Sequence, residues 1–104
     1  MQIQFNTDKN VTASEDLIDS STSLISEELS RFDDQITRVE VHLSDENGNK
    51  DGINDKRCMV EARLAGMQPI AVTDHANTHE QAVSGAIDKL KTSLETITGR
   101  LKNY

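Results

Sequence analysis

The side chains best suited to acid/base chemistry fall on three segments in which polar and apolar residues alternate. They are Glu40 and His42, then Glu61 and Arg63, and finally His75. Alternation places all of them on one polar face of a β-sheet. General acids and bases work best where water is excluded, and an open sheet face does not exclude it. We therefore predict that the protein is not an enzyme and has no catalytic residue. Catalysis by His42 and His75 stays as a third hypothesis.

The stretch from Asp45 to Lys56 is the segment whose composition suggests a metal. Asn47, Asn49 and Asp51 alternate ahead of Gly52, as in the opening of a calcium-binding EF-hand loop. The twelfth position of such a loop would be Cys58 instead of a bidentate glutamate, and the flanking segments are predicted strands. Asn, Asp and Gly are also the residues that a hairpin loop uses. We interpret the stretch as a hairpin loop and predict no metal ligand; cation binding by this loop is the alternative interpretation.

The rest of the sequence has no pattern typical of a cofactor site. Cys58 is the single cysteine, so no intrachain disulfide forms, which fits a reducing cytosol. Its place in an alternating segment points it toward the core, where cysteine behaves as a small apolar residue. The sequence has no Gly-rich phosphate loop, no paired CxxC and no Ser/His/Asp pattern. We predict no cofactor, no small-molecule substrate and a cytoplasmic location, since no signal peptide or membrane-spanning apolar run is present.

Basic side chains remain as the candidate binding residues, in a chain whose formal net charge is −7. That acidity opposes general nucleic-acid binding, which gains affinity when Lys and Arg replace counterions. The charge is unevenly distributed: residues 1–34 hold two basic and eight acidic side chains, whereas residues 78–104 hold four basic and three acidic ones. The basic residues either belong to a charge-balanced solvated surface or contact an RNA backbone and recognise its shape.

Hydrophobic periodicity predicts one α+β domain, residues 1–104, with the element order β-α-β-β-β-α. The predicted strands are Gln2–Asn6, Ile36–Ser44, Arg57–Ala65 and Gln68–His75, and the predicted helices begin at Thr12 and Thr78 and end near Asp34 and Tyr104. Each helix start carries a capping-box pattern, Thr12 with Glu15 and Thr78 with Gln81. We expect a four-stranded sheet with both helices packed on its apolar face and the polar face open.

Several long ungapped segments resemble the ribosome hibernation-promoting factor family, also called ribosome-associated inhibitor A or sigma-54 modulation protein. They are MQIQFNT at the start, Val11–Leu17, ITRVEVHLSDENG from Ile36, KRCMVEARLAG from Lys56 and AVSGAIDKL from Ala82. The chain is similar to a short, acidic and divergent branch of this family. The resemblance implies a fold like that of a double-stranded-RNA-binding domain. It also implies that the protein is a bacterial, cytoplasmic factor, which regulates translation by binding the small ribosomal subunit under stress or in stationary phase.

The resemblance also implies which residues contact ribosomal RNA. Lys89 matches the basic position of the family's Asp-Lys-Leu motif, and Arg100 and Lys102 match its basic end. The predicted rRNA-binding set is Lys89, Lys91, Arg100 and Lys102 on the last helix, with Arg38, Arg57 and Arg63 on the sheet.

The sequence departs from the family pattern in both helices. Arg31 is the one base of the first helix, and Thr92, Thr96 and Thr98 stand where the family commonly has bases. The alternative hypothesis is therefore a divergent protein-binding module that has lost strong rRNA affinity and docks a basic partner on its acidic first helix. A homodimer is possible but the sequence does not indicate one.

Overall fold

The computed structural model describes residues 1–8, 11, 13–45 and 55–102, with side chains described as far as residue 99. Its elements are β1 (Gln2–Thr7), α1 (Glu15–Glu28), the 3₁₀ helix η1 (Ser30–Phe32), β2 (Ile36–Asp45), β3 (Lys56–Leu64), β4 (Ile70–Ala76) and α2 (His79–Lys102). The predicted α+β class and the order β-α-β-β-β-α are confirmed.

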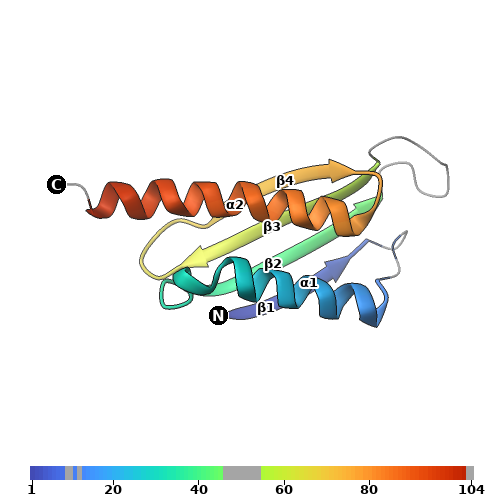
Figure 1. Cartoon of the computed structure of the whole chain (residues 1–104), viewed down its shortest axis with the longest axis horizontal. Helices are drawn as coiled ribbons and strands as arrows, with labels where there is room; N and C mark the ends of the chain where they lie inside the picture. Colours follow the sequence, from blue (N-terminus) through green and yellow to red (C-terminus); the bar gives the residue numbers. More distant parts are fainter. Residues whose placement is uncertain (9–10, 12, 46–54, 103–104) are drawn as a thin grey trace.

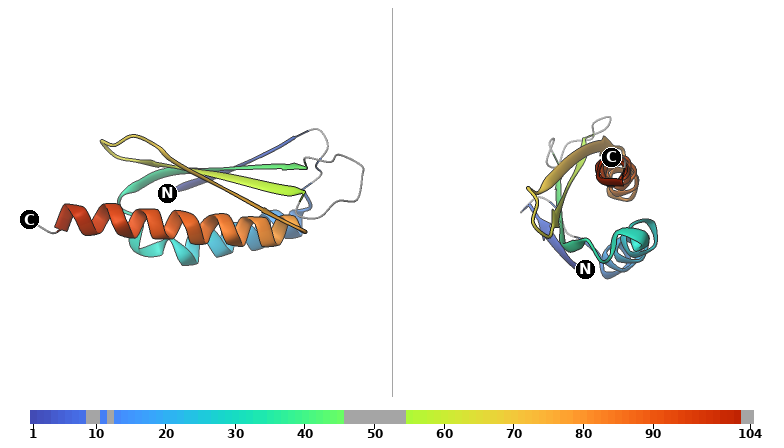
Figure 2. Two further views of the ribbon diagram at one scale, coloured as in Figure 1. Left: turned by 90° about the horizontal axis from the view of Figure 1, so that it is seen from above. Right: turned by 90° about the vertical axis from the view of Figure 1, so that its left-hand side faces the viewer.

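The molecule has two layers, a four-stranded sheet and a pair of helices (Figure 1). The spatial order of the strands is β1-β2-β3-β4, with β1 parallel to β2 and the other neighbours antiparallel. A parallel pair needs a crossover connection, and α1 supplies it between β1 and β2. Figure 2 shows both helices on the same side of the sheet, so the opposite face is open as expected.

Strand alternation decides which side chains enter the core. Val39, Val41 and Leu43 of β2 face the helices and are at most 1% exposed. Cys58 and Val60 of β3 are fully buried beside them, because register partners on neighbouring strands point to the same face. The residues between them in sequence form the open face, as the sequence pattern predicts.

Helix α2 covers the sheet with an almost uninterrupted apolar stripe. The N–H of Gln81 donates to Thr78 Oγ1 at 3.1 Å, so the predicted cap at Thr78 is confirmed. The fully buried stripe consists of Ala82, Val83, Ala86, Ile87, Leu90 and Leu94, none more than 1% exposed. Burying each of the larger aliphatic side chains contributes about 1.5–3 kcal/mol. This stripe therefore fixes α2 on the sheet, and it ends at Leu94.

Helix α1 begins later than the capping-box pattern at Thr12 predicts. Ser14 is its N-cap, with the N–H of Leu17 donating to Ser14 Oγ at 3.1 Å. Glu15 is consequently the first helical residue and cannot serve as the third residue of a box that starts at Thr12, which itself lies outside the described residues. The prediction was wrong because two hydroxyl residues precede Glu15, and spacing alone did not distinguish them. The helix ends at Glu28, and the tighter η1 turn follows it.

Candidate nucleic-acid interface

The predicted rRNA-binding residues lie in three separate parts of the fold. Strands β2 and β3 hold Arg38, Arg57 and Arg63 on the open sheet face, because alternation turns them away from the helices. Lys89 and Lys91 lie in the middle of α2, in the other layer. Arg100 and Lys102 belong to the last turn of α2, and their side chains are outside the described part of the structure. The fold therefore separates the sheet arginines from the helix lysines.

Two of the sheet arginines are direct neighbours. Arg38 and Arg63 are register partners across β2 and β3, and the next pair on the same face is Glu40 with Glu61. Like charges directly opposite one another destabilise a sheet. Here each arginine reaches along its own strand instead: Arg38 Nη2 lies 2.6 Å from Glu40 Oε1, and Arg63 Nε lies 3.1 Å from Glu61 Oε1. The four groups form a nearly neutral charge quartet on the open face.

The quartet has a measurable electrostatic consequence. The hydrogen bond from Arg38 holds the pKa of Glu40 below its ordinary value, and the charges of Arg38 and Arg63 add to the effect, against an opposing contribution from burial. Because the folded-state pKa is lowered, the resulting stability is present above the unfolded pKa and is lost as pH falls through the folded value.

We expect Arg38→Ala to raise the pKa of Glu40, because it removes both the hydrogen bond and the nearer positive charge. A carboxyl-detected NMR pH titration of the two proteins measures this directly. Arg31→Ala serves as the control, since Arg31 pairs with Glu95 in the helix layer. An unchanged Glu40 titration in Arg38→Ala would show that the quartet does not form in solution.

The helix lysines are also paired, and they face different neighbours. Lys89 Nζ donates to Thr73 O at 2.9 Å and to Asp74 Oδ1 at 3.0 Å, both on β4. Lys91 Nζ lies 3.0 Å from Glu28 Oε2 on α1. The two lysines therefore lie on opposite flanks of α2, one toward the β4 edge of the sheet and the other toward the neighbouring helix. An RNA backbone that contacts both must exchange these intramolecular partners.

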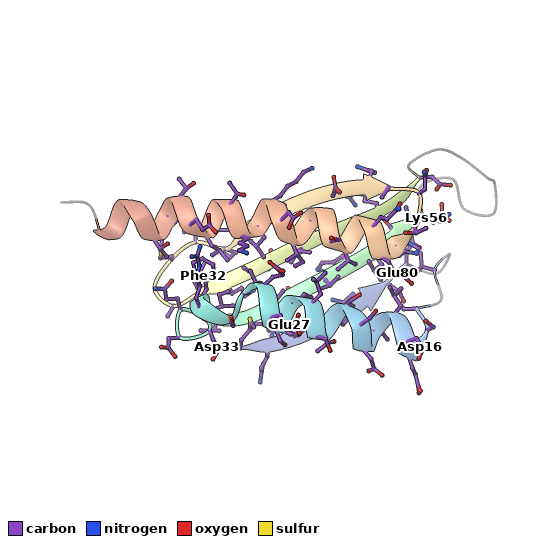
Figure 3. All side chains as sticks on the ribbon, viewed as in Figure 1. Asp16, Glu27, Phe32, Asp33, Lys56 and Glu80 are labelled. Carbon is purple, nitrogen blue, oxygen red and sulfur yellow. The ribbon has the colours of Figure 1, made fainter. Side chains whose placement is uncertain are left out.

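Helix α1 carries an exposed acidic surface. Glu15, Asp16, Asp19 and Glu27 are exposed on α1, and none of them forms an ion pair with another described residue. Figure 3 shows Asp16 and Glu27 toward opposite ends of α1, with Asp33 beyond its end. This row of carboxylates lies in the same layer as Lys91, so it lowers the electrostatic potential near that lysine.

Comparison with known protein families identifies the relatives of this chain. A family model described as sigma 54 modulation protein / S30EA ribosomal protein matches residues 5–102. The chain belongs to this family. The family resemblance drawn from the sequence is thereby confirmed. No curated protein matches the sequence of this S30EA-family chain.

Two solved structures have the S30EA fold seen here. The N-terminal domain of Thermus thermophilus Protein Y superposes with a TM-score of 0.73 at 20% identity, covering 93% of this chain and 99% of that one. A ribosomal subunit interface protein from Coxiella burnetii gives a TM-score of 0.69 at 22% identity, covering 95% of this chain and 99% of the other. At such low identity these likenesses establish the fold.

Three threonines of α2 stand at positions where the S30EA resemblance leads one to expect basic residues. Their hydroxyl groups form hydrogen bonds within the helix. The hydroxyls of Thr92 and Thr96 donate to the carbonyls of Asp88 and Thr92 at 3.1 and 3.0 Å. Thr98 Oγ1 donates to Leu94 O at 2.8 Å. Each hydroxyl proton is thus used within the helix itself, a pattern that threonine favours because its side chain is short.

The histidines of this S30EA-family chain do not form a common site. His42 is the register partner of Met59, whereas His75 is the partner of Arg57. The two histidines are therefore two strands apart, about 10 Å across the sheet. Arg63 lies six residues along β3 from Arg57, or roughly 20 Å, so Arg63 shares the open face with the two histidines but does not lie beside both of them. No cluster of His, Cys, Asp or Glu suited to a metal ion occurs among the described residues.

A charged cluster that the sequence did not reveal closes the end of the β2–β3 pair. The carboxylates of Asp45 and Asp55 are buried, and Lys56 Nζ lies 2.7 Å from Asp45 Oδ2 and 3.3 Å from Asp55 Oδ1. The hydrogen bond with Asp45 is the main reason why the pKa of Lys56 is raised. An ammonium group thus stands between the two carboxylates, where a cation would otherwise balance them. Residues 46–54 of the suggested calcium loop lie outside the described residues.

Cys58 is inert in this structure. Its side chain is fully buried, and burial, with the nearby charge of Asp74, raises the pKa of its thiol to about 12. A nucleophilic cysteine needs exposure and a lowered pKa, because the thiolate is the reactive form. The predicted core position of Cys58 is confirmed.

Proposed function

We propose that this protein is a non-enzymatic, cytoplasmic factor that binds the small ribosomal subunit and reduces translation under stress or in stationary phase. The supporting observation is membership of the sigma 54 modulation protein / S30EA ribosomal protein family over residues 5–102. The similar fold of the ribosomal subunit interface protein from Coxiella burnetii points in the same direction. Among the described residues no helix is long and apolar enough to cross a membrane.

Helix α2 is the proposed contact with rRNA. It carries Lys89, Lys91, Arg100 and Lys102, and its surroundings leave the first two partly accessible, with side chains 54% and 37% exposed. Exposed ion pairs contribute about 0–1 kcal/mol each, so phosphates can replace Asp74 and Glu28 at small cost. Arg38, Arg57 and Arg63 lie on the opposite face, so we propose that they make a minor second contact, with a different rRNA segment, that contributes little to the affinity.

The test is sedimentation of the purified protein with purified small subunits at low salt. We expect Lys89→Glu/Lys91→Glu to reduce binding by about 10-fold or more, because two phosphate contacts become repulsive. Arg38→Gln/Arg63→Gln is the matched control from the sheet, and we expect it to bind within about 3-fold of the wild type. Absence of the wild-type protein from ribosomal fractions, with subunits in excess, would rule out the proposal. A larger loss in the sheet variant would move the contact to the open face.

A second candidate function is favoured by the exposed acidic surface of α1, where Glu15, Asp16, Asp19 and Glu27 form no ion pair with other described residues. Under this alternative the fold is kept, strong rRNA affinity is lost, and α1 docks a basic protein. A pull-down from nuclease-treated extract distinguishes the two, since a protein partner survives nuclease whereas an rRNA-mediated one does not. Under the alternative, we expect retention to survive nuclease and to depend on Asp19, Glu27 and Glu28. Under the first proposal, we expect retention only from untreated extract, and it should depend on Lys89 and Lys91.

A further inference from the structure

The end of α2 has no sheet beneath it. Leu94 is fully buried, but Ile97, the next residue of the apolar stripe, is only partly covered. Figure 1 shows α2 continuing past the turn between β3 and β4. Met67 in that turn is 43% exposed and is the exposed large hydrophobic residue of the described structure. Apolar side chains from both layers thus meet at an uncovered end of the core.

These side chains line a cleft between the two layers. Leu64, Ala65, Met67 and Ile97 form its apolar surface, with Asp34 at its side, and its volume is about 210 Å³. A second hollow of about 340 Å³ lies against Arg31, Phe32 and Glu95. Gln35 and Thr98 line both, so the two hollows adjoin beneath the last turns of α2. Together they make an extended groove.

The size of the cleft indicates what kind of group it takes. Sites for small molecules usually enclose about 300–1,000 Å³ and are mostly apolar. The apolar part is smaller than this, at about 210 Å³, and the adjoining hollow of about 340 Å³ is lined mainly by polar residues. The apolar part suits one apolar side chain, and the adjoining hollow allows a peptide backbone to continue past it. Peptide grooves commonly work in this way, with apolar anchors in pockets and polar residues along the rim.

Charge selects a basic peptide over an acidic or neutral one. Asp34 is exposed beside the apolar cleft and forms no ion pair with the described residues. Arg31, the basic residue of the adjoining hollow, is already paired with Glu95 and lies 4.8 Å from the centroid of the Phe32 ring. The formal net charge of the chain is −7, which favours a basic partner in general. A lysine or arginine near the anchor can therefore pair with Asp34, whose carboxylate is not engaged by any described residue.

We propose that the groove lined by Leu64, Met67 and Ile97 binds a short segment of a basic protein. One apolar side chain of that segment occupies the cleft, and an adjacent lysine or arginine pairs with Asp34. The groove lies at the end of the core and uses none of the proposed rRNA-binding residues with described side chains. Binding to it can be measured on the isolated protein, in the absence of ribosomes.

The probes are two fluorescein-labelled peptides of equal charge, KRLFKR and KRSGKR. We expect KRLFKR to bind about 10-fold or more tightly than KRSGKR in fluorescence anisotropy, because only KRLFKR offers an apolar side chain to the cleft. Backbone NMR shifts caused by KRLFKR should concentrate at residues 64–67 and 95–99. Equal affinity for the two peptides, no binding of KRLFKR, or shifts spread along α1 would overturn the proposal.

Substitutions at exposed positions complete the test, since they leave the buried core intact. We expect Met67→Ser to weaken KRLFKR binding about 5-fold and Asp34→Asn to weaken it about 3-fold. Asp16→Asn, at the far end of α1, is the matched charge control and should leave the affinity within about 1.5-fold. If Asp16→Asn weakens binding as much as Asp34→Asn, the peptide follows overall charge and the groove is not its site.

Discussion

Replacing Glu15, Asp16, Asp19 and Glu27 together by their amides is expected to strengthen binding to small ribosomal subunits by about 3- to 10-fold at low salt. Each carboxylate about 10 Å from a phosphate repels it by roughly 0.4 kcal/mol in water, and salt near 0.1 M reduces this by about two-thirds. The side chains form no ion pair with other described residues, so their neutralisation removes repulsion without breaking a pair. Sedimentation with purified subunits measures the change.

Ionic strength provides the control for this charge variant. The gain in affinity for the small subunit should decrease as the salt concentration rises, because the Debye length falls to about 3 Å at 1 M. Thermal unfolding must accompany the measurement, since Glu15 and Asp16 lie in the first turn of α1 and stabilise it by roughly 0.3–1 kcal/mol each. Weaker binding by a folded variant would contradict the prediction. It would mean that α1 itself makes the contact, as the protein-docking alternative requires.

Gly85→Ala is expected to lower the free energy of unfolding by about 1–3 kcal/mol. A Cβ at position 85 would lie 1.8 Å from Asp74 Oδ2 and 2.7 Å from its Cγ. Aspartate has a short side chain, and its other oxygen is held by Lys89 Nζ at 3.0 Å. Either α2 must move away from β4 or the carboxylate must rotate out of that bond. Chemical denaturation with a circular dichroism readout measures the loss.

The same substitution should raise the free energy of unfolding instead of lowering it once the side chain of Asp74 is shortened. In an Asp74→Ala background, Gly85→Ala is expected to raise stability by about 1 kcal/mol, because alanine is the better helix former and the obstructing carboxylate is gone. Thr92→Ala, on the exposed part of α2, is a control that should change stability by less than about 0.7 kcal/mol. Loss of stability from Gly85→Ala in both backgrounds would show that the contact with Asp74 is not what requires a glycine.

Local patterns in the sequence were sufficient for the elements of this fold. Alternation in β2 and β3 identified which residues face the core, and the stripe from Ala82 to Leu94 identified α2, because both depend on periodicities that backbone geometry imposes. The start of α1 was misplaced at Thr12, because Ser14 competes with it for the same capping role. Which hydroxyl caps the helix depends on where the chain leaves β1, and that is a property of the packed structure.

Tertiary structure alone decided how the charges are used. The sequence places Lys89 and Lys91 two residues apart, yet one binds Asp74 of β4 and the other binds Glu28 of α1. It places Arg38 and Arg63 far apart, yet register makes them neighbours. Periodicity is a local property, so the sequence by itself determined the elements and their buried faces. Ion pairs and grooves join residues that are distant in sequence, so they emerged only when the sheet and the helices packed together.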